Sequence, residues 1–224
     1  MLAVDRLGEL SNEMVFVGGC ATGLLITDSA APPIRITRDV DAIAQVVSLA
    51  GYHVLSGKLR RQGFKEDVSE GAPVCRWVSE NVILDVMPVD KEILGFGNEW
   101  YAPAVANAVL IQLPSGQRIR VVSAPYFLIT KLMAFDGRGR DDYLMSHDIE
   151  DIIAVIDGRQ ELFSEVMGSE SRLVKVLSER FNELLKNAAF IDAISGHMPT
   201  DEVSQARVSM IKNVIERIAQ NKAV

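Results

Sequence analysis

Short apolar runs separated by turn-forming residues occupy positions 1–122, which is the pattern of an α+β fold. The run MVFV at 14–17 ends at two glycines and predicts a buried strand. Residues 34–43 follow a proline pair and begin by alternating apolar with polar side chains, which predicts a second strand. Residues 75–90 and 108–123 each predict a hairpin, because two apolar runs flank a short polar turn.

Amphipathic periodicity predicts helices between the strands and throughout the C-terminal part of the chain. The expected helices span 2–12, 20–27, 43–63, 123–140, 146–159, 169–190 and 200–222. Residues 91–107 show no clear period and are expected to form an irregular connection. Because only helical patterns follow Ser123, we predict two domains, an α+β domain at 1–122 and a helical domain at 123–224.

Composition and charge narrow the class of protein further. A formal net charge of −7 argues against non-specific binding of nucleic acid, although Lys58, Arg60 and Arg61 form a local basic cluster. No apolar run approaches the ~18 residues of a membrane span, and the N-terminus lacks the features of a signal peptide. The two cysteines, Cys20 and Cys75, cannot make a disulfide framework in a chain of 224 residues. We therefore expect a cytoplasmic protein without membrane partners.

Acidic side chains occur inside two of the predicted strands. Asp39 and Asp41 are two residues apart, so in a strand they project from the same face and need a cation to offset their repulsion. Asp85 interrupts the apolar run VILDVM of another predicted strand. Mg²⁺ binds oxygen ligands and commonly uses one or two carboxylates together with substrate phosphates. If the two strands are neighbours, the three aspartates form one divalent-metal site.

The glycine pair upstream of these acids suggests the substrate. Gly18 and Gly19 end the first strand and precede a predicted helix. A backbone without Cβ atoms can approach a phosphate closely, and amides at a helix N-terminus favour anions. A phosphate cradle ahead of a metal site is what a nucleoside triphosphate (NTP) requires.

These motifs together resemble the nucleotidyltransferases of the AbiEii/AbiGii toxin family, within the DNA polymerase beta-like superfamily. The matching segment VGGCATGLL…RITRDVDAIA supplies Gly18, Gly19, Arg35, Thr37, Asp39 and Asp41. The similarity continues in the segment TKLMAFDGRGRDDYLMSHDIED, which supplies Lys131, Ala134, Arg138, Asp148 and Asp151. Two positions depart from the family pattern: Cys20 replaces a serine or threonine, and His147 replaces a lysine or arginine.

The resemblance implies a mixed β-sheet with flanking helices, followed by a C-terminal helical bundle that completes the nucleotide cleft. It also implies Mg²⁺- or Mn²⁺-dependent transfer of a nucleoside monophosphate from an NTP to a tRNA or protein, and a toxin with a cognate antitoxin. The implied metal ligands are Asp39, Asp41 and Asp85, with Asp85 also a candidate base for the acceptor hydroxyl. The implied nucleotide-binding residues are Gly18, Gly19, Arg35, Thr37, Lys131 and Arg138, and Asp148 is expected near Lys131 as a further catalytic group.

Other interpretations stay open at this point. Cys20 and His147 leave room for a catalytically degenerate nucleotidyltransferase fold that binds a nucleotide or a partner without turnover. An Asp-x-Asp motif also serves glycosyltransferases, although their nucleotide domains are generally longer than residues 1–90. His147 and Asp148 form a His-Asp doublet of the kind found in metal phosphohydrolases, but the remaining histidines, His53 and His197, lack the spacing for that chemistry.

Overall fold

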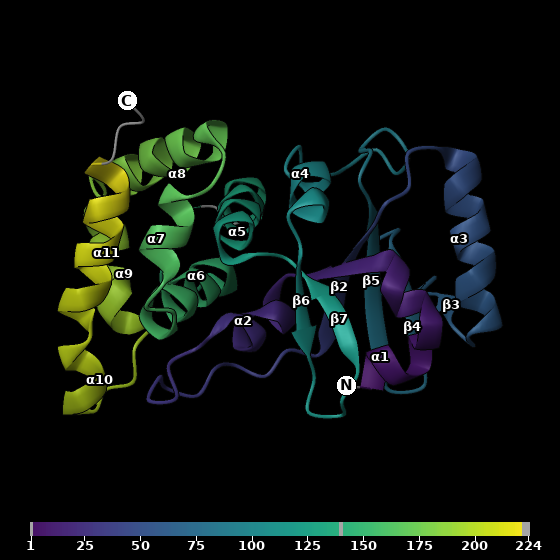
Figure 1. Cartoon of the computed structure of the whole chain (residues 1–224), viewed down its shortest axis with the longest axis horizontal. Coiled ribbons are helices and arrows are strands. Elements are labelled where there is room, and N and C mark those ends of the chain that lie inside the picture. The colour runs from purple at the N-terminus through teal and green to yellow at the C-terminus, as the bar shows by residue number, and fades with distance from the viewer. Residues whose placement is uncertain (1, 139–140, 221–224) are drawn as a thin grey trace. The chain divides into compact units, whose positions relative to one another are not determined.

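The computed structural model describes residues 2–138 and 141–220, and it divides into two compact units. The sheet unit comprises residues 1–21 and 36–123, and the helical unit comprises residues 22–35 and 124–224. Figure 1 shows a β-sheet in the first unit and a group of helices in the second. The predicted α+β class is therefore confirmed. The predicted helices at 123–140 and 200–222 extend in part into residues outside the described ranges.

The sheet unit is built on one seven-stranded mixed sheet in the order β3-β4-β5-β2-β1-β7-β6. Its strands are β1 (Met14–Val17), β2 (Asp39–Ala44), β3 (Lys65–Glu66), β4 (Arg76–Ser79), β5 (Val82–Pro88), β6 (Val109–Gln112) and β7 (Arg118–Val121). β1 is an interior strand and pairs antiparallel with β2 and parallel with β7. β2 in turn pairs parallel with β5. The four residues of β1 are all buried, as the unbroken apolar run predicts.

Both predicted hairpins are present. β4 and β5 pair antiparallel around a two-residue turn at Glu80 and Asn81, where Glu80 has a φ of +50°. β6 and β7 pair antiparallel at one edge of the sheet. The tight β4–β5 turn matters for the site, because a two-residue turn sets which residues of the two strands lie opposite one another.

The sheet unit also contains short helices that precede or connect its strands. They are α1 (Leu2–Leu7), a 3-10 helix (Gly8–Glu13), the start of α2 (Gly19–Leu25), α3 (Leu49–Arg61) and α4 (Tyr101–Ala106). The hydroxyl of Ser48 accepts a hydrogen bond from the N–H of Gly51 and caps α3. The helix predicted at 43–63 therefore starts later, because Ile43 and Ala44 belong to β2.

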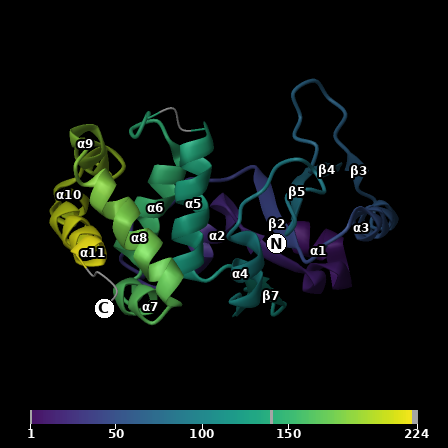
Figure 2. The ribbon, with the colours of Figure 1, turned by 90° about the horizontal axis from the view of Figure 1, so that it is seen from above.

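Within residues 22–35, 124–138 and 141–220, the helical unit contains the end of α2 and seven further helices. These are α5 (Ala124–Arg138), α6 (His147–Gly158), α7 (Leu162–Met167), α8 (Ser171–Leu184), α9 (Ala188–Gly196), α10 (Glu202–Ala206) and α11 (Val208–Gln220). α5 packs against α6, α7 and α8, and α11 packs against α6, α7, α8 and α9 (Figure 2). Buried isoleucines of α6 and buried leucines of α8 contribute to the core of this unit.

The segment between α2 and β2 is attached to the helical unit by hydrogen bonds. Arg159 donates to the carbonyl oxygen of Leu25 at 2.7 Å, and Arg207 donates to the Asp28 carboxylate at 2.7 Å. The N–H of Thr27 donates to the Gly158 carbonyl oxygen at 2.8 Å. These contacts attach residues 22–35 to helices that lie more than a hundred positions later in the sequence.

Several sequence-based predictions are wrong in detail. The helices expected at 2–12 and 200–222 are each divided into two shorter ones. The strand expected at 34–43 begins only at Asp39, and the side chain of Ile36 is largely exposed. The helix expected at 169–190 breaks, because Asn187 caps a new helix through the N–H of Ala189. The connection at 91–107 contains α4, which its weak periodicity did not reveal.

Two further features concern the chain as a whole. Among the described residues no helix combines the length and apolar character needed to span a bilayer. Within the described residues neither Cys20 nor Cys75 forms a disulfide, and burial raises the pKa of the Cys75 thiol to about 12, with the nearby Asp85 adding to the effect.

Candidate functional site

The three predicted metal-binding aspartates lie on neighbouring strands of the sheet unit. In the register of β2 and β5, Asp41 lies directly beside Asp85. Asp39 is two residues before Asp41 on the same strand, so it projects from the same face. The condition set for a shared site, that the two acid-bearing strands are neighbours, is therefore met, and Asp39, Asp41 and Asp85 are called the acid cluster below.

Gly18 shapes one side of the acid cluster. β1 ends at Val17, which lies opposite Asp41, and the chain then turns at Gly18 with a φ of +66°. A Cβ atom at Gly18 would lie 2.0 Å from Oδ2 of Asp41. The first glycine of the pair is therefore required both by its backbone conformation and by the Asp41 carboxylate.

Gly19 and Cys20 begin α2 directly after this turn. The Cys20 thiol donates to the carbonyl oxygen of Val17 at 3.0 Å. A second, longer contact of 3.8 Å leads to the carbonyl oxygen of Asp41. The AbiEii/AbiGii family, which the sequence resembles, has a hydroxyl side chain at this position. Here the thiol of Cys20 instead contacts backbone carbonyl oxygens beside the acid cluster.

A fourth charged residue, Arg76, lies among the acids. Its Nε and Nη2 donate to the two carboxylate oxygens of Asp85, each at 2.8 Å. Nη2 also donates to Oδ2 of Asp39 at 3.3 Å. The hydrogen bonds to Asp85, followed by the charges of Asp85 and Asp39, raise the pKa of Arg76 above its ordinary value.

The fit of a divalent cation can be tested against these contacts. The backbone register, the shared face and the room kept at Gly18 suit a metal held by carboxylate oxygens. As the side chains stand, however, no group of three His, Cys, Asp or Glu residues in the described ranges is arranged to hold a metal ion. The guanidinium of Arg76 instead supplies the positive charge to Asp85 and Asp39.

The predicted nucleotide-binding lysine lies in the helical unit, inside a group of paired charges. Nζ of Lys131 donates to Asp148 at 3.0 Å and to Asp151 at 2.6 Å. All three residues are buried. The expected proximity of Asp148 to Lys131 is confirmed, and the side chains lie on α5 and α6, which pack together.

Two arginines complete this group. Arg138, two helical turns after Lys131, donates from Nε and Nη2 to Asp148, each at 2.9 Å, and its side chain is 71% exposed. Arg35 lies 3.2 Å from Asp151 and 3.2 Å from Glu150. These six residues, Arg35, Lys131, Arg138, Asp148, Glu150 and Asp151, are called the ionic cluster below.

The electrostatics of Asp148 follow from these partners. Burial by itself raises the pKa of this carboxyl. The hydrogen bonds from Arg138 and the charges of Lys131 and Arg138 outweigh burial, and the net pKa lies below its ordinary value. Asp148 is therefore ionised at neutral pH and holds both cations.

The other predicted residues are placed less centrally. Thr37 is partly buried and belongs to the sheet unit, whereas Arg35, two positions earlier, belongs to the helical unit. His147 is 70% exposed at the first turn of α6 and contacts Glu150 at 3.0 Å. The described contacts of Arg35 are thus with α6 and not with the acid cluster.

Sequence reasoning missed Arg76, although a signal was present. The predicted turn at Glu80 and Asn81 pairs Ser79 with Val82, and counting back along both strands pairs Arg76 with Asp85. The contact of Arg35 with Asp151 had no comparable signal, since 116 positions separate the two residues.

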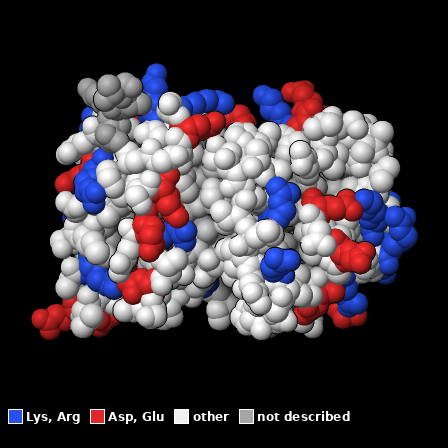
Figure 3. All heavy atoms as spheres, viewed as in Figure 1, with Lys and Arg blue, Asp and Glu red and all other residues white. Residues whose placement is uncertain are grey.

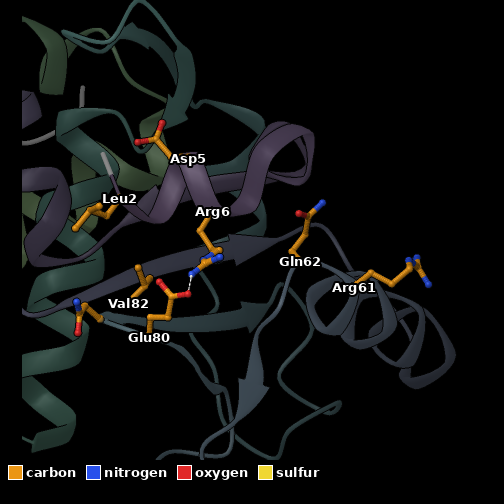
Figure 4. A pocket seen from close by; sticks show the side chains of 8 residues that line it. Leu2, Asp5, Arg6, Arg61, Gln62, Glu80 and Val82 are labelled. Carbon is orange, nitrogen blue, oxygen red and sulfur yellow. Dashed lines mark ion pairs between the residues drawn. The ribbon is translucent and has the colours of Figure 1, made fainter.

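A separate groove of about 520 Å³ lies in the sheet unit (Figure 4). It is lined by Leu2, Asp5, Arg6, Arg61, Gln62, Glu80, Asn81 and Val82, none of which is a predicted site residue. An ion pair between Arg6 and Glu80 crosses its wall. The open shape and the internal pairing of its charges give the groove no evident ligand.

The predicted basic cluster at the end of α3 is largely neutralised. Figure 3 shows lysines and arginines gathered over α3 with acidic residues beside them. Lys58 pairs with Glu13, and Arg60 pairs with Glu66, each at 2.6 Å. Two of the three residues of the predicted basic cluster are therefore neutralised by acidic partners.

Comparison with known proteins gives structural likeness only. The sequence matches no protein-family model and no curated protein sequence. The structure is similar to JHP933 from Helicobacter pylori, at 13% sequence identity and a TM-score of 0.47, over 99% of this chain and 92% of that chain. It is also similar to a candidate nucleotidyltransferase from H. pylori, at 11% identity and a TM-score of 0.44, over 99% of this chain and 95% of that chain. With both TM-scores below 0.5, this likeness by itself assigns no activity, and membership of the AbiEii/AbiGii family stays a prediction.

Proposed function

We propose that this protein is a nucleotidyltransferase that transfers a nucleoside monophosphate from an NTP to a macromolecular acceptor, a tRNA or a protein. We further propose that it acts as the toxin of a toxin–antitoxin pair, which is what its motif order resembles. The observation that carries the activity is the acid cluster. Asp41 and Asp85 lie side by side on parallel strands, with Asp39 on the same face and Gly18 turning against the Asp41 carboxylate.

We assign the binding of a metal–triphosphate group to the sheet unit because of the register of its three acids, although their side chains are not arranged around a metal as they stand. Asp39, Asp41 and Asp85 would hold Mg²⁺ or Mn²⁺, and the metal would supply positive charge to the triphosphate and to the leaving pyrophosphate. Gly18 lets the backbone pass close to the acids, and Gly19 opens α2, whose first N–H groups favour a phosphate oxygen. This combination suits a substrate that carries several phosphates.

The residues of the helical unit supply further cations. Arg138 is largely exposed although it is bonded to Asp148, so its guanidinium is accessible to a phosphate oxygen. Lys131 is buried and held by two carboxylates, which fixes its position. Asp148 orients both cations, and Asp151 links Lys131 to Arg35. We assign binding and orientation of the triphosphate to these side chains.

The proposal is tested by incubating the full chain with each of the four labelled NTPs, Mg²⁺ and either total RNA or a cell lysate. Transfer of label to RNA or protein, abolished in Asp41→Asn, is the expected result. Absence of transfer to every acceptor, together with equal cell growth on expression of the wild type and Asp41→Asn, would remove both the enzyme and the toxin proposals.

A second function is favoured by one specific observation. Both carboxylate oxygens of Asp85 are engaged by Arg76, which is the arrangement expected of a fold that binds a nucleotide or a partner without turnover. Calorimetry that detects NTP binding without any product would support this alternative, and detectable transfer would exclude it.

A further inference from the structure

Arg76 lies within the acid cluster because of the strand register. It lies opposite Asp85 in the antiparallel pairing of β4 with β5, and Asp85 lies opposite Asp41 in the parallel pairing of β5 with β2. Residues opposite one another on paired strands project from the same face. Arg76, Asp85 and Asp41 therefore form one row across three strands, and the guanidinium cannot leave the row without a rotamer change.

The contacts of Arg76 are those of a specific counterion. Its fork meets both oxygens of Asp85 at 2.8 Å, a bidentate geometry that a lysine cannot reproduce. The Asp85 side chain is 9% exposed and the Arg76 side chain 23% exposed, so water weakens this pair less than a surface pair. The third bond, to Asp39 at 3.3 Å, bridges the two acid-bearing strands.

The same oxygens are the ones a divalent cation would use. Three carboxylates and one guanidinium leave two negative charges, which one divalent cation neutralises. A metal that also takes Asp85 as a ligand would approach the two oxygens that accept from Arg76, where the positive charge of the guanidinium repels it. A nearby alternative partner exists in Asp67, whose N–H donates to the Arg76 carbonyl oxygen at 3.0 Å and whose charge also acts on Arg76.

We propose that Arg76 is a resident counter-cation of the acid cluster, which competes with a divalent metal for Asp85 and releases that carboxylate only when the metal binds. Asp39 and Asp41 then provide the first contacts for the metal, and Asp85 joins after the guanidinium has moved. Arg76 thus sets the metal concentration at which the acid cluster becomes complete. This inference rests on the proposed function for the presence of the metal, but not for the transfer reaction.

The test is calorimetric titration of Mn²⁺ into the full chain at low ionic strength and without nucleotide, for the wild type and for Arg76→Gln. Arg76→Gln is expected to bind Mn²⁺ about tenfold more tightly, the size of effect expected when one charge-assisted hydrogen-bonded pair no longer competes. Arg60→Gln is the matched control. It removes one arginine of the same unit that pairs with Glu66, so its affinity should equal that of the wild type.

An affinity of Arg76→Gln that is unchanged or weaker, or no binding by either protein, would overturn the inference. If Arg76→Gln does not fold, Arg76→Lys keeps the charge without the bidentate fork, and it is expected to bind Mn²⁺ about threefold more tightly. In addition, saturating the wild type with Mg²⁺ should shift the Arg76 Nε–H resonance, and an unshifted resonance would contradict displacement.

The outcome is independent of the transfer assay. If Arg76→Gln binds Mn²⁺ more tightly but the wild type transfers no label, the counter-cation role of Arg76 is supported and the proposed transfer activity is rejected. If the wild type transfers label but Arg76→Gln has the Mn²⁺ affinity of the wild type, the transfer activity is supported and the counter-cation role is rejected.

Discussion

At the scale of single residues, the acid cluster requires a glycine, which has no side chain, at position 18. Gly18 has a left-handed backbone conformation and lies against the Asp41 carboxylate. Several other glycines of this unit also have positive φ values, but a Cβ atom at Gly8 would meet nothing within 4 Å. Comparing substitutions at Gly8 and Gly18 therefore separates the cost of backbone strain from the cost of a steric clash with Asp41.

Gly18→Ala is expected to lower the free energy of unfolding by about 3 kcal/mol, because strain and a clash with Asp41 add together. Gly8→Ala, which adds only the strain of a positive φ, is expected to cost about 1 kcal/mol. Urea unfolding of both variants measures the difference. Equal losses in the two variants would show that the Asp41 carboxylate does not restrict Gly18.

Asp148 gives a second prediction at this scale, with a defined pH dependence. Its folded pKa is lowered below the ordinary value of 3.8, so the unfolded chain binds its proton more readily. The stability that Asp148 contributes is therefore present above about pH 4, and it is lost as the pH falls through the folded pKa.

Asp148→Asn should accordingly be less stable than the wild type by about 3 kcal/mol at pH 7, since Lys131 stays buried with one carboxylate fewer. The difference should shrink once the pH falls below about 4. Urea unfolding from pH 7 to pH 3 measures it. A difference that does not depend on pH would show that the charge of Asp148 is not what stabilises the fold.

At the scale of elements, α6 carries both acids that hold Lys131. Its first turn is capped by Ser146, whose hydroxyl accepts a hydrogen bond from the N–H of Ile149 at 3.3 Å. This cap fixes where the helix begins, and so the positions of Asp148 and Asp151.

Ser146→Ala should lower the free energy of unfolding by about 1 kcal/mol and speed amide hydrogen exchange in the first turn of α6. Ser48→Ala removes the corresponding cap of α3 in the other unit and is the matched control. It should cost a similar amount but leave exchange in α6 unchanged. Faster exchange in α6 for both variants would contradict a local role of the cap.

Elements with a strong local pattern could be predicted from the sequence. The run MVFV, both hairpins and the Ser146 cap follow from periodicity and turn residues, whereas the pairing of the two acid-bearing strands is known only from the structure. The alternation at residues 34–38 was misleading, because a strand needs a partner. β1 pairs with Asp41–Ala44 and β5 pairs with Asp39–Ala44, so neither neighbouring strand extends the pairing back to Ile36.

At the scale of the whole molecule, long-range contacts were beyond the sequence. The assignment of residues 22–35 to the helical unit depends on Arg159 and Arg207, which lie far along the chain. No local pattern reveals such pairs. The candidate site is similar: the motif residues could be picked out, but the bonding of Lys131 to two acids and of Asp85 to Arg76 required the structure.

The proposed function gives separate roles to residues of each unit. The acid cluster is the proposed metal site, and Lys131 and Arg138 are the proposed ligands of the triphosphate. Metal binding and transfer should therefore respond differently to substitution, and comparing them separates a nucleotidyltransferase from a protein that only binds metal.

The most direct test measures label transfer from NTPs and Mn²⁺ binding on the same three proteins: the wild type, Asp41→Asn and Lys131→Met. The wild type should show both, Asp41→Asn neither, and Lys131→Met should bind Mn²⁺ normally with transfer reduced at least about a hundredfold. Transfer that survives in Asp41→Asn, or that is absent from the wild type with every NTP and acceptor, would contradict the proposed activity.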